Sequence, residues 1–224
     1  MPAKTKITRE DVIDAAFEIV RKGGWAKLSA RSISKMLKSS TMPIYYQFTS
    51  MEMIEEEVVK KAVALQAEYS AVPLTDVSAL NNGIGYVLFA WEEPHLFAAV
   101  YDEKHISMNI QYSNALFDAD VEELTRNPRM AGLSRDQLRY FQFLAWIFVQ
   151  GIASLRPWVK ETRGNLDKET LIELIRDGLR ILTYGFLAYQ ARFSARKKKK
   201  QFNKADHTKK SVSKVSRNHQ NIQP

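Results

Sequence analysis

Apolar side chains recur along this chain at the three- and four-residue spacing of helices, and no stretch alternates apolar and polar positions as a strand does. Near the start, Thr8 is followed three positions later by Asp11, which resembles a capping box, and Gly23-Gly24 ends the apolar run that follows. Hydroxyl side chains precede three further predicted helices, the last of which continues to about residue 70. The expected caps are Ser29, then Ser40 or Thr41, then Ser50.

Further helices are predicted in the rest of the chain, a short one at about residues 95–101 and longer ones at about 77–91, 106–124, 133–159 and 166–193. The last two carry too much apolar surface for a helix with one solvated face. Each should therefore be buried on two sides, against its own domain and against a partner. This pattern predicts a partner interface, with interface residues on the final helix at Leu171, Ile175, Leu179, Leu182 and Phe186.

Charge divides the chain into three parts. The net charge is +5 over residues 1–50, −6 over 51–193 and +9 over 194–224. The last part has few apolar residues and dense like charge, so we expect a disordered basic tail. The chain lacks cysteine, an apolar N-terminal segment and an uninterrupted apolar stretch long enough to cross a membrane. These features predict a cytoplasmic protein with no membrane partner.

A stretch without acidic residues lies in the N-terminal part. Between Glu18 and Glu52 the chain has no carboxylate side chain but six basic ones. A surface cleared of acidic groups suits a polyanionic partner such as double-stranded DNA. Chance clustering of solvated lysines would give the same pattern. The six basic residues are Arg21, Lys22, Lys27, Arg31, Lys35 and Lys38.

The segment SSTMPIYYQFTS, residues 39–50, indicates how the three short N-terminal helices could be used. Their lengths and short connections match a helix-turn-helix unit, whose second short helix enters the major groove. Ile44 and Phe48 would face inward, so Tyr45 and Tyr46 cannot both be buried. Tyrosine can donate to phosphates and pack on sugars and thymine methyl groups. Alternatively, the two rings only cover the domain.

The stretch ITREDVIDAAFEIVRKGGWAKLSARSISKMLKSSTMPIYYQFTSMEMI resembles the DNA-binding domain of the TetR family of transcriptional regulators. The resemblance covers about residues 7–54 and includes AAFEIVRKGGW, LSARSISKML and the IYYQF core of the third helix. It implies an all-α chain, with a helix-turn-helix domain over residues 1–50 and a helical ligand-binding and dimerisation domain over 51–193. Carried over by position, the implied DNA contacts are Ala30, Arg31, Thr41, Met42, Pro43, Tyr45, Tyr46 and Gln47.

Two positions depart from the family pattern. Lys38 stands in the turn where many members have glycine, which predicts either a different turn or a left-handed lysine. Met51 stands where many have a lysine that reaches a phosphate, so Ser50 and Lys38 would supply that contact. The remainder of the chain resembles the family only in arrangement. That arrangement implies a ligand pocket and a four-helix interface between two subunits.

The body of the chain could contain a mostly apolar cavity with sparse polar groups, although ordinary core packing would account for any one of its residues. Such a cavity suits a small apolar or aromatic effector. Its expected lining is Trp91, His95, Tyr101, His105, Met108, Tyr112, Phe143, Trp146 and Gln150.

No spacing of residues indicates a catalytic group, a metal site or a cofactor, so we do not expect an enzyme. The sequence predicts a ligand-responsive repressor that binds a near-palindromic operator as a homodimer. The alternatives are a nonspecific nucleic-acid-binding protein that uses its basic ends and, with less support, an enzyme.

Overall fold

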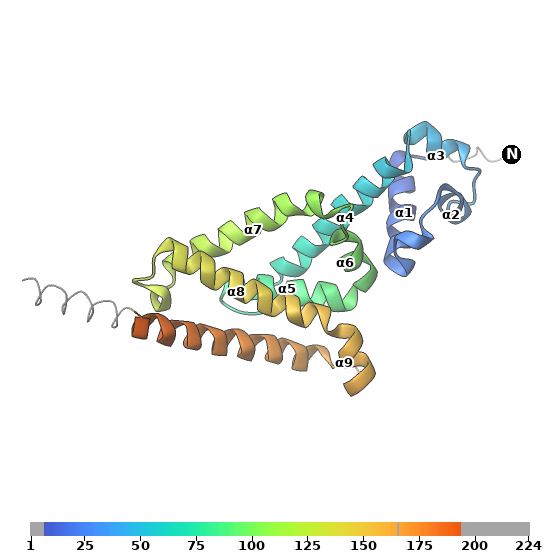
Figure 1. Ribbon diagram of the computed structural model, residues 1–224. Coiled ribbons are helices and arrows are strands. Elements are labelled where there is room, and N and C mark those ends of the chain that lie inside the picture. Colours follow the sequence, from blue (N-terminus) through green and yellow to red (C-terminus); the bar gives the residue numbers. More distant parts are fainter. Residues whose placement is uncertain (1–6, 165, 194–224) are drawn as a thin grey trace, which may run out of the picture. The chain divides into compact units, whose positions relative to one another are not determined.

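The computed structural model describes residues 7–164 and 166–193, and every regular element in these ranges is helical (Figure 1). The predicted all-α class is therefore confirmed. Residues 168–193 are helical as well. The preceding helices are α1 (Arg9–Gly23), α2 (Ala30–Met36), α3 (Met42–Gln47), α4 (Met51–Ala71), α5 (Ser78–Glu92), α6 (Pro94–Val100), α7 (Ile106–Arg126), α8 (Arg135–Ser154) and α9 (Arg156–Arg163), with 3₁₀ turns at Trp25–Lys27 and Pro128–Met130.

Packing divides the chain into two compact units, Met1–Leu179 and Arg180–Pro224. This division differs from the predicted boundaries after residues 50 and 193. Residues 180–193 are the described part of the second unit and form one helical segment. The predicted basic tail, residues 194–224, lies outside the described residues.

Side-chain caps define the start of most N-terminal helices, as the sequence predicts. The Asp11 amide donates to Thr8 Oγ1 (3.1 Å), and the Asp11 carboxylate accepts from the Thr8 amide (2.8 Å). Ser29 and Ser50 each accept from the amide three residues later, at 3.0 and 3.4 Å. Thr41 occupies the cap position of α3 without making a capping bond, because its backbone is helical rather than extended.

The predicted helix over residues 133–159 is wrong in one respect, because it is broken at Leu155. Pro157 has no amide hydrogen and fits only the first turn of a helix, so α9 begins beside it. The two helices α8 and α9 meet at an angle of 47°. No single helix among the described residues is long and apolar enough to cross a membrane, and the bent pair α8 and α9 meets only the criteria of length and composition.

A first hydrophobic core joins the three N-terminal helices to the rest of the first unit. α1 packs against α2, α3, α4 and α6, so one core extends across the boundary predicted after residue 50. Buried side chains from all five helices contribute to it, including Val12, Phe17, Val20, Ile33, Ile44, Phe48, Ile54, Val58, Leu96 and Val100. Arg21 of α1 adds an ion pair with the buried carboxylate of Glu93, between α5 and α6.

A second core lies between α5, α8 and residues 168–179. Leu171 and Ile175 belong to it, and Ile175 is fully buried, so an interface with a second chain cannot use them as predicted. Leu179 is half-buried against the same core. Of the other predicted interface residues, Leu182 and Phe186 lie in the second unit.

Candidate nucleic-acid interface

The turn between α2 and α3 is a Schellman motif with Lys38 at its left-handed position. The Lys38 amide donates to the Lys35 carbonyl (3.3 Å), and the Ser39 amide donates to the Ser34 carbonyl (2.9 Å). Lys38 has φ of +50°, and it is the only non-glycine residue with positive φ in the described ranges. The turn therefore has the left-handed conformation that glycine usually occupies. Lys38 adopts it at a conformational cost and places a cation beside the start of α3.

The six residues of α3 separate into a buried side and an exposed side, as predicted. Ile44 and the following Phe48 are buried in the first core. Tyr45 is 53% exposed and Tyr46 is 82% exposed, and Met42 is exposed as well. Residues 42, 45 and 46 are spaced by three and four, so they share one helix face. The structure thus brings a thioether and two phenol rings together on the solvent side of α3.

Two polar groups hold the C-terminal end of α3 in place. Arg9 of α1 donates to the Gln47 carbonyl (3.2 Å), and its guanidinium lies over the Phe48 ring, 4.1 Å from the centroid. The side-chain amide of Gln47 donates to the Ile7 carbonyl (3.2 Å). Gln47 is one of the implied DNA contacts, and this bond directs its side chain to the chain before α1. Because the hydrogen bond gives it a structural task, Gln47 is a positioning residue for α3.

The basic residues of the acid-free segment fall into two groups. Glu18 pairs with Arg21 at 3.5 Å and with Lys22 at 3.6 Å, and Arg21 also pairs with Glu93. These two cations fix α1 and its connection to the body. The remaining four have no carboxylate within 4.0 Å among the described residues: Lys27, Arg31, Lys35 and Lys38.

The other predicted DNA contacts surround α2 and α3. Ala30 is the half-buried first residue of α2, and Thr41 is exposed in the turn. Pro43 is half-buried in the first turn of α3. Ser50 uses its hydroxyl to cap α4, and Met51, which follows it, packs on the first core. The hydroxyl of Ser50 is thus already engaged within the chain.

The described residues predicted to line an effector cavity lie in several different surroundings. The Tyr101 hydroxyl accepts from the Gln66 side chain (3.1 Å) and its ring packs in the cores, while Gln150 accepts from the Tyr86 hydroxyl. His95 is exposed. Phe143 and Trp146 are also exposed and stack on each other along α8, with ring centroids 5.9 Å apart. The side chains of Met108 and Tyr112 lie outside the described part of the chain.

His105 lies at the junction between the N-terminal helices and the rest of the first unit. Its ring contacts Trp25, with centroids 4.6 Å apart, and its Nε2 is 3.2 Å from a Glu55 carboxylate oxygen. Nδ1 is 2.8 Å from the Asp102 carboxylate. Although partial burial acts to raise it, the pKa of Asp102 is lowered by hydrogen bonds from His105. The buried histidine therefore bridges α4 and the α6–α7 connection.

Trp91, one of the predicted effector residues, lines a cavity. This cavity lies between α5, α9 and the start of the helix at residue 168. Its basic lining residues, Arg156, Lys160 and Lys168, could not be identified from the sequence, because they become neighbours of Trp91 only through folding. No group of three or more histidine, aspartate or glutamate side chains in the described ranges is placed to hold a metal ion. No protein-family model matches this chain, and no curated protein sequence matches it significantly.

Proposed function

We propose that this chain is a transcriptional regulator of the TetR type, a homodimer that binds a near-palindromic DNA site through α2 and α3 and is released by a small ligand. The observation that carries the proposal is the exposed face of α3. Tyr45 and Tyr46 extend into solvent, and neither hydroxyl has a hydrogen-bond partner within the described chain. Large rings left outside the core are available to a partner.

The basic residues around α2 support a polyanionic partner. Four lysines of the body are each paired with a carboxylate, so their charge is locally balanced: Lys60, Lys61, Lys104 and Lys168. Lys27, Arg31, Lys35 and Lys38 around α2 have no such partner in the described ranges. Arg31 and Lys35 are four apart on α2 and so share a face, next to the turn with Lys38. Cations in this arrangement can neutralise phosphates.

An exposed apolar face on α8 supports the homodimer. Tyr140, Phe143 and Ile147 are exposed at spacings of three and four residues, with Trp146 beside them. On the helix that begins at residue 168, Leu174 is exposed, whereas Leu171 and Ile175 are buried. An apolar helix face of this size is typical of a protein interface. We therefore assign the subunit contact to α8 and Leu174.

The test is a selection of binding sites from random DNA, followed by titrations with the selected site and with unrelated DNA. Tyr46→Ala should weaken binding to the selected site by about 1–3 kcal/mol, with little effect on unrelated DNA. Tyr46→Phe is the matched control, because it keeps the ring and removes only the hydroxyl. Lys35→Gln with Lys38→Gln should weaken binding to both DNAs and reduce the salt slope by about 2.

Two results would refute the proposal. Selection that recovers no preferred sequence would favour the nonspecific nucleic-acid binder. If the Tyr45→Ala, Tyr46→Ala double variant keeps its full sequence preference, α3 is not the element that recognises the DNA sequence.

A further inference from the structure

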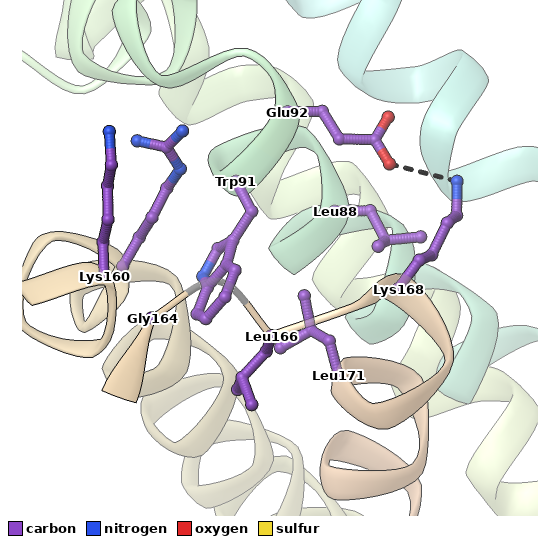
Figure 2. Close-up of a pocket in the computed structure, with 9 residues that line it drawn as sticks. Leu88, Trp91, Glu92, Lys160, Gly164, Leu166, Lys168 and Leu171 are labelled. Carbon is purple, nitrogen blue, oxygen red and sulfur yellow. Dashed lines mark hydrogen bonds and ion pairs between the residues drawn. The ribbon is translucent and has the colours of Figure 1, made fainter. Parts of the chain in front are cut away.

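The cavity beside Trp91 has a volume of about 300 Å³ and an apolar wall (Figure 2). Leu88 and Trp91 of α5 meet Leu166 and Leu171 there, and Figure 2 shows the indole between Lys160 on one side and Lys168 on the other. The indole nitrogen donates to the Ile152 carbonyl of α8 (3.1 Å), which fixes the ring. The cavity is thus a preformed apolar surface bordered by charge.

The charge at this cavity is positive and only partly balanced. Lys168 is 3.0 Å from the Glu92 carboxylate, which also accepts from the Tyr69 hydroxyl (2.8 Å). Arg156 and Lys160 of α9 also line the cavity, and neither has a carboxylate partner among the described residues. Glu92 is the only acidic residue in the lining. Two cations therefore remain for an anion from outside the chain.

A second cavity of about 240 Å³ adjoins the first and shares Leu88 and Lys168 with it. The rest of its wall is largely apolar and comes from the end of α4 and the segment after it, including Leu65, Val72 and Leu74. It offers space for an apolar chain that extends beyond the first cavity. An inorganic anion would leave these apolar walls unused.

We infer that the two cavities bind an organic carboxylate with an apolar body. The carboxylate would accept from Arg156 and Lys160, and the apolar body would lie on Trp91 and Leu88. The apolar part of the wall selects ligands by shape, while the cations fix the orientation of the ligand. A neutral ligand of the same shape would leave both cations without a partner and gain nothing from them.

The experiment titrates the full chain, without DNA, with decanoate, 1-naphthoate, hexanoate and 1-decanol, and follows binding by calorimetry and tryptophan fluorescence. Decanoate or naphthoate should bind, and these two distinguish a linear from a flat body. Hexanoate should bind at least tenfold more weakly than decanoate, since each buried methylene changes affinity about fourfold. Decanol should also bind at least tenfold more weakly. Equal affinity for decanoate and decanol, or no binding of either carboxylate, would overturn the inference.

Variants locate the site. Arg156→Gln with Lys160→Gln should weaken carboxylate binding about tenfold and leave decanol binding unchanged. Arg126→Gln with Arg129→Gln removes two charges from residues that line neither cavity, so it should bind carboxylates as the wild type does. Lys160→Glu reverses the charge of an exposed, unpaired side chain, so it should not disturb folding. It should also weaken carboxylate binding. Unchanged carboxylate affinity in the folded cavity variants would refute the site.

The inference deepens the proposed function by naming the chemical class of its effector, and in that respect it rests on that function. The binding experiment contains no DNA, and the operator titrations contain no carboxylate. Failure of one is therefore distinguishable from failure of the other. If both succeed, decanoate or naphthoate should reduce operator affinity in the wild type and not in the Arg156→Gln, Lys160→Gln variant.

Discussion

Lys38 provides a test of the turn that positions α3. The residue has a left-handed backbone, in which an L side chain crowds the following carbonyl. Lys38→Gly removes this crowding, whereas Lys38→Ala keeps the Cβ atom that causes it. Both variants remove the same charge, so the difference between them isolates the backbone strain. We expect Lys38→Gly to be the more stable of the two.

The magnitude follows from two opposing terms. A left-handed residue with a Cβ costs about 1–2 kcal/mol. Glycine also has more conformational freedom in the unfolded chain than alanine. This stabilises the unfolded state by about 0.4–1 kcal/mol and opposes the relief of strain. From the middle of each range, the net advantage of Lys38→Gly over Lys38→Ala should therefore be about 0.8 kcal/mol. In a chain of this size that corresponds to a melting temperature higher by about 1–4 °C.

Lys35 is the matched control, because it lies three residues earlier in the last turn of α2. There the backbone is helical, so Lys35→Gly should be less stable than Lys35→Ala by about 0.8–1 kcal/mol. Urea unfolding followed by circular dichroism gives all four values. The same sign of the glycine effect at both positions would refute the assignment of strain to Lys38. The two Lys38 variants should also lose DNA affinity equally, since each removes one cation.

Three further predictions concern the body of the first unit. Burial raises the pKa of Asp120 to about 6, although Asn82 and Gln142 donate to its carboxylate. The folded protein therefore holds this proton more tightly than the unfolded one. The bound proton contributes about 2–3 kcal/mol to the free energy of unfolding, fully present below pH 4 and lost as pH rises through 6. This pH dependence should be absent from the denaturation curves of Asp120→Asn. Gly85→Ala should destabilise strongly, because the new Cβ would lie 2.4 Å from a carbonyl oxygen of α4, whereas Gly151→Ala meets no atom within 4 Å and should be neutral or stabilising in thermal melts. Phe143→Arg should yield monomers in sedimentation velocity, and an unchanged dimer would remove α8 from the interface.

The local features of the N-terminal helices could be read from sequence, because the interacting groups are three or four residues apart. The hydroxyls of Thr8 and Ser29 reach amides within their own first turn, so no distant contact is needed. Helical spacing likewise placed Ile44 and Phe48 inside, which left two tyrosines that could not both be buried. The break near Pro157 was also readable, since proline rarely fits a helix interior, but the apolar pattern concealed it.

Only the tertiary structure decided which apolar side chains are buried within the chain and which stay exposed. Leu171 on one helix and Phe143 on another are both large apolar residues in helical patterns, yet the first is buried in the second core and the second is exposed. Spacing along a helix shows that a face is apolar but does not identify what covers it. In the same way, Arg156 and Lys160 become neighbours of Trp91 only when α9 folds back beside α5. Contacts between residues more than 60 positions apart depend on the packing of whole helices, and that packing is not encoded in any local stretch.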